Sequence, residues 1–169
     1  MRPQKSDYAP YYETYIGLVK GDNIVSALET IHSATQTFLK TIPAEKSNFR
    51  YAPGKWSVKQ VLLHITDCER VFNYRALSIA RGDTISLPGF DENTWAANSA
   101  PEKRTITDVA EEFSLVRQNT IHLFKTFDDE MVSRRGIANN NPVTVLALGY
   151  MIAGHEIHHI NVMKERYNL

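Results

Sequence analysis

The residues whose types and spacing could do chemistry are concentrated in one short segment, His155-Glu156-Ile157-His158-His159. Neutral imidazole is the commonest metal ligand, and two histidines four residues apart on a helix lie one turn above the other, so both can bind one ion. Burying two imidazoles without partners for their nitrogen atoms costs free energy, which favours a metal site over a plain core position. The segment therefore predicts a divalent metal site.

A helical wheel decides which of these histidines face the core. With His155 at 0° and about 100° per residue, the apolar residues of this helix fall between about 340° and about 80°. His159 falls near 40°, inside that stripe, and His158 near 300°, outside it. A third ligand must come from a facing helix, and His64 is the candidate because it lies in the middle of another helical segment. Its angle, at the flank of its apolar stripe, permits an inward aim but does not compel it.

The same segment satisfies the pattern H-E-x-x-H, in which two histidines bind zinc and the glutamate activates a water molecule. Zinc peptidases with this pattern take a third ligand further downstream. Residues 160–169 contain no histidine, and their only acid is Glu165. No strand-rich segment precedes the helix to align a peptide substrate. We therefore favour a metal-dependent function other than that of a zinc peptidase.

Length and composition predict one ordinary domain spanning residues 1–169, with residues 1–20 as an N-terminal arm. The chain has 169 residues, is 43% hydrophobic and has a formal net charge of zero, so no basic field is available to hold nucleic acid. Its single cysteine, Cys68, excludes an internal disulfide and suits a reducing compartment. No apolar run reaches the roughly 18 residues that a membrane span needs. We expect a soluble, cytoplasmic protein without membrane partners.

Hydrophobic spacing predicts an all-α fold, a four-helix bundle with a long loop between helices 2 and 3. That loop, residues 82–105, is long enough to be functional and to contain a short helix. A second loop is expected over residues 134–141, and a tyrosine-rich leader over residues 2–16 is expected to pack on the body through its rings. The residues expected to cap or open the four helices are Asp22, Ser57, Thr107 and Pro142.

From about the first helix to the C-terminus, the sequence resembles the DinB-like (DinB/YfiT) superfamily of metal-binding four-helix bundles. The segments that carry the resemblance are Pro53–Asp67 (PGKWSVKQVLLHITD), Leu87–Trp95 (LPGFDENTW) and Gly154–Ile160 (GHEIHHI). The family commonly has Arg-Gly-Gln after its histidine pair, whereas this chain has Ile160-Asn161-Val162. That departure bears on the subfamily rather than on metal binding.

The resemblance implies up-down-down-up connectivity, a homodimer, and a divalent metal ion, zinc or nickel, held by His64, His155 and His159. Three imidazole ligands leave a position open for water or substrate, as in catalytic sites. The family relation implies a metal-dependent hydrolase, or a transferase or isomerase that uses a low-molecular-weight thiol, acting on a small-molecule substrate. In the hydrolase, Glu156 or Asp67 would accept the proton of the activated water. In the thiol reaction no protein base is essential.

Other interpretations stay open beside these. Glu156 could instead orient His159 or be solvated, and that role is favoured. The chain could also be a non-catalytic stress-response or scaffold bundle whose metal is structural or absent. Nucleic-acid binding is disfavoured by the neutral charge.

The remaining candidates have simpler roles. Trp56, just before a helix, is expected to be a hydrophobic staple, and Trp95, in the long loop, is a candidate wall of a small-molecule pocket. Cys68 is expected to be a buried, inert thiol. His32 and His122 are expected to be hydrogen-bonded core residues rather than ligands.

Overall fold

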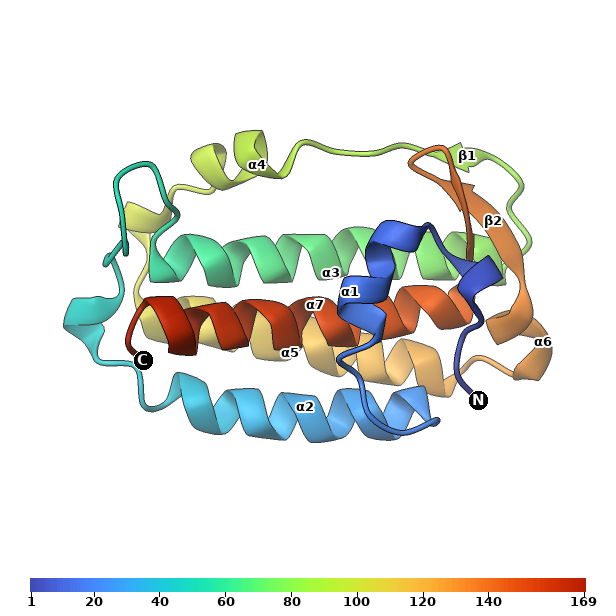
Figure 1. The fold of residues 1–169 in the computed structure, drawn as a ribbon, viewed down its shortest axis with the longest axis horizontal. Coiled ribbons are helices and arrows are strands. Elements are labelled where there is room, and N and C mark those ends of the chain that lie inside the picture. The colour runs from blue at the N-terminus through green and yellow to red at the C-terminus, as the bar shows by residue number, and fades with distance from the viewer.

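Four long helices form the body of the protein, and the computed structural model describes all residues from Met1 to Leu169. In Figure 1, α2 and α7 run in one direction and α3 and α5 in the other, which is the predicted up-down-down-up order. Helices α3 and α2 each pack against both α5 and α7. The predicted all-α four-helix bundle is confirmed. The bundle helices are α2 (Ile24–Leu39), α3 (Val58–Ala80), α5 (Ile106–Lys125) and α7 (Val145–Arg166).

A side-chain cap begins each bundle helix, because the first N–H groups of a helix have no partner within it. Ser57 caps α3 as predicted: its Oγ accepts from the Gln60 N–H at 3.3 Å, and the Gln60 side chain accepts from the Ser57 N–H at 3.0 Å. The other three predictions were wrong by one to three residues. Several polar residues precede each helix, and only the residue with extended backbone can serve as the cap. The caps are Asn23 and Thr105 rather than Asp22 and Thr107, and α7 begins at Val145 after its cap Thr144, so Pro142 lies before the helix and not in its first turn.

Residues 134–141, predicted as a loop, contribute to a small sheet instead. Strand β2 (Arg135–Ala138) pairs antiparallel with β3 (Asn141–Thr144), and β1 (Ser86–Leu87) pairs parallel with β2. Asn139 and Asn140 make the turn with φ values of 49° and 61°, the left-handed conformation that two-residue hairpin turns require and that asparagine tolerates. Pro142 lies in β3, an edge strand, where a missing N–H is tolerated.

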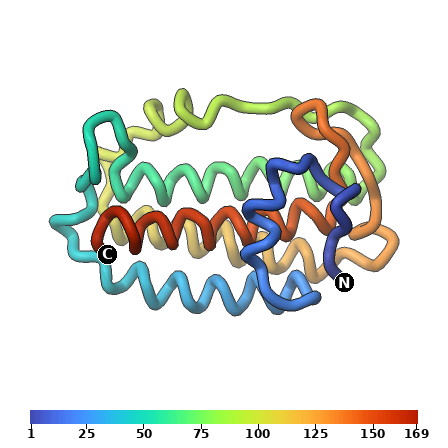
Figure 2. Tube along the Cα trace, viewed as in Figure 1, coloured from blue at the N-terminus to red at the C-terminus, as the bar shows by residue number.

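The long connection between α3 and α5 has its length because these helices run parallel. The chain must return from one end of the bundle to the other, and Figures 1 and 2 show it passing back alongside α3. It contains β1, the expected short helix as α4 (Glu92–Asn98), and a single turn of 3-10 helix at Pro101–Lys103. A further short helix, α6 (Asp129–Ser133), follows α5.

The N-terminal arm is folded and packs on the bundle. It contains 3-10 turns at Lys5–Asp7 and Pro10–Tyr12 and the single-turn helix α1 (Glu13–Ile16). Helix α1 packs against α7 (Figure 1). The contact requires a glycine at position 154, because a Cβ there would overlap the backbone carbonyl of Tyr15. The arm therefore lies directly over the part of α7 that carries the histidines.

The core has an apolar cluster at each end of the bundle. On α7 one cluster takes residues from Val145 to Ala153, and the other takes Ile160 and Met163. Buried polar side chains of all four helices lie between these clusters along the sequence or close to the position where one cluster gives way to the other; they include Thr35, His64, Glu69, Arg117, Thr120, His155 and Glu156. The middle of the bundle is therefore polar although solvent scarcely reaches it. None of the helices is both long and apolar enough to cross a membrane.

Candidate metal centre

Three histidines converge in the polar middle of the bundle, and we call them the histidine cluster: His64 of α3 with His155 and His159 of α7. The Nε2 atom of His155 lies 3.1 Å from Nε2 of His64 and 3.1 Å from Nε2 of His159. The three potential ligand atoms all lie within 4.8 Å of one another. The structure thus brings together the three residues that the sequence selected. It also shows that the His64 side chain points inward, toward the other two histidines, which the helical wheel alone does not determine.

The chemistry of the donor atoms fits a cation. An imidazole nitrogen carries either one proton or one lone pair in the ring plane, so Nε2 of His155 can make one good hydrogen bond, not two. Two other nitrogen atoms nevertheless lie at 3.1 Å from it. Nitrogen atoms bound to a tetrahedral zinc ion at about 2.05 Å lie about 3.3 Å apart, close to these separations. A divalent ion would satisfy all three lone pairs, and no arrangement of protons does so.

Burial keeps the histidine cluster neutral. It lowers the pKa of His64 to about 4. It also lowers the pKa of His159 to about 3, with the neighbouring histidines adding to the effect. For His155 burial comes first, and repulsion from the other histidines depresses the pKa further. Neutral rings keep their lone pairs free, which is the state in which imidazole binds a metal.

A cavity of about 480 Å³ opens on the histidine cluster. Its walls come from the N-terminal arm, Trp56 and α3, the connection before α4 and the start of α4, the β2–β3 hairpin and α7. It is large enough for a small molecule and combines aromatic walls with a few polar groups, as ligand sites do. The lining residues are Ala9, Tyr11, Tyr12, Tyr15, Trp56, His64, Cys68, Phe72, Arg75, Gly89, Phe90, Glu92, Asn139, Asn141, His155 and His159.

Aromatic rings and a thiol enclose the histidine cluster. The Trp56 ring lies 4.6 Å from the His64 ring, and the Tyr15 ring packs edge-on against His155 at 5.3 Å, both measured between centroids. Trp56 also packs against the apolar cluster at its end of the bundle, so it covers the site as well as the core. The Cys68 sulfur lies 3.6 Å from Nδ1 of His64, and burial raises the pKa of this thiol to about 12. Cys68 is thus buried and protonated, as expected.

Glu156 does not take either of its predicted roles. Its side chain is fully buried, does not line the cavity, and forms an ion pair with Arg117 of α5. Arg117 also binds Glu69 of α3 through two hydrogen bonds of 2.8 Å. We call Glu69, Arg117 and Glu156 the arginine cluster. Because Glu156 neither faces the histidine nitrogens nor contacts solvent, it is not the proton acceptor, a support for His159 or a solvated residue. The H-E-x-x-H peptidase geometry is absent for the same reason.

Two further candidates also lie outside the cavity lining. Asp67 pairs with Arg70 at 3.2 Å on a partly exposed face of α3, and burial raises its carboxyl pKa. The position of Asp67 gives it no access to the histidine cluster from the cavity. Trp95 is 42% exposed and stacks on Phe90 with ring centroids 4.6 Å apart. Phe90, not Trp95, is the side chain that forms the wall.

The other histidines stay outside the cluster. His158 is half-buried and packs against Tyr15, on the side of α7 that the wheel predicted. His32 is half-buried, and its Nε2 lies 3.4 Å from the Ser114 hydroxyl. His122 is exposed, so its predicted place in the core is wrong. It lies in the last turn of α5, on the solvent side.

Several cavity residues were missed by the sequence analysis. The tyrosine-rich leader was expected to pack on the body through its rings, but nothing placed Tyr11, Tyr12 and Tyr15 at the histidines. On a helical wheel Arg75, eleven residues after His64, falls on the same side of the helix as His64, which is a usable signal for its place in the cavity. No sequence signal placed the hairpin asparagines Asn139 and Asn141 in the cavity, because only the fold brings the β2–β3 turn over the site.

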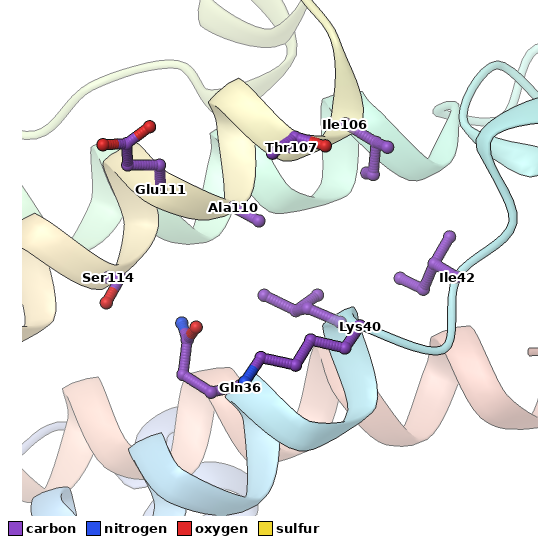
Figure 3. A pocket seen from close by; sticks show the side chains of 9 residues that line it. Gln36, Lys40, Ile42, Ile106, Thr107, Ala110, Glu111 and Ser114 are labelled. Atoms are coloured by element: carbon purple, nitrogen blue, oxygen red, sulfur yellow. The ribbon is translucent and has the colours of Figure 1, made fainter.

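A second hollow, between α2 and α5, lacks such chemistry. It has a volume of about 390 Å³, and Figure 3 shows Lys40 and Gln36 on one wall facing Glu111 and Ser114 on the other. The only group of three or more potential metal ligands in the molecule is the histidine cluster. The candidate site is therefore the cavity over the histidine cluster.

Comparisons with known proteins agree with this architecture. The family model described as the DinB superfamily matches residues 27–163. YfiT from Bacillus subtilis, described as a probable metal-dependent hydrolase with an unusual four-helix bundle topology, aligns with a TM-score of 0.70 and 16% identity over 97% of this chain and 92% of YfiT. The DinB-like protein YjoA from Bacillus subtilis aligns with a TM-score of 0.62 and 20% identity over 87% of this chain and 90% of YjoA. A comparison with curated proteins gave no match.

Proposed function

This chain belongs to the DinB superfamily, and we propose that it binds one divalent metal ion through His64, His155 and His159 and hydrolyses a small molecule in the adjoining cavity. The observation that carries the proposal is the convergence of three neutral imidazoles, two buried and one half-buried, at one point of that cavity. The description of YfiT as a probable metal-dependent hydrolase supports the choice of reaction.

The surrounding residues have roles that follow from their positions. A divalent ion with three imidazole ligands is a Lewis acid that keeps coordination positions for water or substrate. Trp56 and Tyr15 cover the rings of His64 and His155 and keep bulk water from them. Phe72 and Phe90 supply apolar wall for the substrate. Hydrolysis also needs a group that accepts a proton, and Glu92 at the start of α4 is the only carboxylate among the lining residues.

One observation favours a second candidate, transfer of a low-molecular-weight thiol to the small molecule. No buried carboxylate lines the cavity, and Glu92 is exposed. A thiol loses its proton much more readily than water does, so the reaction needs no strong base from the protein. Product analysis with a panel of activated esters and electrophiles, with and without added thiol, separates the two. Glu92→Gln should abolish hydrolysis but spare thiol transfer.

Metal content tests the core of the proposal. The untagged protein, purified without chelator or nickel resin, is analysed by mass spectrometry beside His64→Ala, His155→Ala and His159→Ala. We expect about one ion, zinc or nickel, per chain in the parent protein and nearly none in the three variants. His158→Ala is the matched control, a histidine of the same helix outside the cluster, and should keep its ion. A folded parent protein that takes up neither zinc nor nickel would refute the site, and equal loss in the control would refute the ligand assignment.

A further inference from the structure

A buried arginine without a counter-ion lines the same cavity. Arg75 of α3 is 4% exposed and takes part in none of the ion pairs of the protein. The one hydrogen bond of its guanidinium runs from an Nη atom to the Pro88 carbonyl oxygen at 2.6 Å, and its buried Nε–H has no partner. The side chain therefore brings a positive charge and unused donors to the cavity wall.

The other fully buried arginine shows what is missing. Arg117 is also buried in the same bundle, more deeply than Arg75, but its guanidinium binds Glu69 through two parallel hydrogen bonds and pairs with Glu156. Buried charges are normally paired, because removing a charge from water without a partner is costly. For Arg75 the fold supplies no carboxylate, so the partner is expected to come from outside the chain.

The environment of Arg75 suits an anion. The Phe72 ring lies 5.6 Å from the guanidinium carbon and limits its movement. Asn139, Asn141 and Tyr12, whose side chains contain neutral donors, line the same cavity, and the Asn141 amide also donates to the Asn139 carbonyl oxygen at 2.7 Å. The sole carboxylate of the lining, Glu92, is exposed. A negative group that enters the cavity therefore meets one buried positive charge and no buried negative one.

The placement of Arg75 relative to the histidine cluster sets the shape of the ligand. Arg75 follows His64 by eleven positions on α3, which separates their Cα atoms by about 16 Å at 1.5 Å per residue. Both side chains lean toward the N-terminus of the helix, and the arginine, being the longer of the two, can reach back further than His64 does, which shortens that gap. A ligand that touches both ends is therefore elongated.

We propose that Arg75 binds a carboxylate group of the substrate, so that the cavity accepts an elongated carboxylate whose other end lies at the histidine cluster. The planar guanidinium fork matches a carboxylate, which it can bind through two hydrogen bonds. The inference rests on the proposed function for the claim that the bound molecule is a substrate. The claim that Arg75 binds an anion is independent of it.

Binding of a matched pair of probes to the metal-free protein tests the inference. The probes are 4-phenylbutyrate and its uncharged analogue 4-phenylbutanamide, titrated by calorimetry and by the NMR signals of the arginine Nε–H groups. We expect the carboxylate to bind at least about tenfold more tightly than the amide and to shift the Arg75 Nε–H signal. Arg75→Met should remove that preference and leave amide binding unchanged. Arg70→Met, which removes an exposed arginine of the same helix, should change neither.

Each other outcome overturns the assignment. Equal binding of the two probes, no binding of either, or unchanged carboxylate binding in Arg75→Met would show that Arg75 is not an anion site. Tighter, Arg75-dependent binding of phenyl phosphate would replace the carboxylate with a phosphate. If Arg75→Met fails to give a folded helical protein by circular dichroism, Arg75→Lys takes its place: it keeps the charge, loses the fork and should still weaken carboxylate binding.

The two proposals can fail separately. Arg75→Met should keep the metal content of the parent protein, and His155→Ala should keep the preference for the carboxylate probe. Loss of the metal site with retained carboxylate binding would refute the proposed function alone. A normal metal content with no carboxylate preference would refute this inference alone.

Discussion

The histidine cluster and the arginine cluster share α3 and α7 and lie at neighbouring positions, yet they differ in how their polar atoms are satisfied. In the arginine cluster, Arg117 is held by Glu69 and Glu156, and none of the three side chains is more than 2% exposed. In the histidine cluster, three neutral rings turn the same kind of atom toward one another beside an open cavity. In the arginine cluster carboxylates face a guanidinium, whereas in the histidine cluster imidazole nitrogens face one another.

The difference separates a structural from a functional polar cluster. Burial would lower the pKa of Arg117, but Glu156 and Glu69 outweigh it and raise that pKa, so the charge stays in place. The partners of the arginine cluster thus come from the fold itself. In the histidine cluster the rings face only one another, and Arg75 forms no ion pair with the protein, and both border the same cavity. Buried groups whose partners are missing point to a ligand.

Breaking the arginine cluster should have the largest effect on stability. Arg117→Met leaves two carboxylates buried without a counter-ion and should lower the free energy of unfolding by about 3 to 5 kcal/mol. Urea denaturation measures the change. The triple variant Glu69→Leu/Arg117→Met/Glu156→Leu, which removes the buried charges together, should recover most of the loss. A single variant as stable as the parent protein would show that this cluster is not closed by mutual pairing.

Acid should weaken the metal-free protein through the histidine cluster. The pKa values of His64 and His159, about 4 and about 3, lie below the value near 6.5 of the unfolded chain. Below pH 6.5 the unfolded chain therefore binds protons that the folded protein does not. The contribution of the neutral histidines to the free energy of unfolding is fully present above pH 6.5. It is lost as the pH drops toward 4, by about 3 kcal/mol for His64 alone.

The matched variant His64→Gln isolates this contribution. Urea denaturation between pH 7 and pH 4 should give it a flatter pH dependence than the parent protein, both without metal. The carboxyl groups titrate in the same way in the two proteins, so their contributions cancel in the difference between the two pH dependences. Identical slopes would contradict the neutral, buried state of His64.

Displacing the N-terminal arm should have a smaller effect. In Gly154→Ala the new methyl group overlaps the Tyr15 carbonyl, so α1 must move away from α7. We expect a loss of about 1 to 3 kcal/mol, as for other overpacked contacts, with the metal ligands still in place. Hydrogen exchange should rise in residues 10–16 while metal content stays unchanged. Unaltered exchange there would show that the arm does not depend on this contact.

The smallest effect is expected outside both clusters. Asp67 makes a partly exposed ion pair with Arg70, and such pairs contribute about 0 to 1 kcal/mol. Asp67→Asn should therefore change stability by no more than that, and metal content and activity should be unaffected. Thermal unfolding and metal analysis check it. A large loss of activity would show that Asp67 takes part in the reaction.

Local patterns predicted much of the fold. Helical spacing found the four bundle helices, and the cap at Ser57 was predicted correctly because its hydrogen bond to the helix is local. The β2–β3 hairpin was missed because its strands are four residues long and its turn uses asparagine rather than glycine. The homodimer, the identity of the metal, the thiol cofactor and the cytoplasmic location remain predictions.

The sequence by itself determined that His155 and His159 share a face, because residues four apart on a helix are brought together by the backbone geometry alone. Only the tertiary structure decided that His64 completes the cluster, that Glu156 turns to Arg117, and that the N-terminal tyrosines and Arg75 line the cavity. The physical reason is the sequence separation over which each feature is determined. A helix repeats with a fixed period, whereas the partner that each face meets depends on how four helices with up-down-down-up connectivity pack and on where the long connection and the arm cross them.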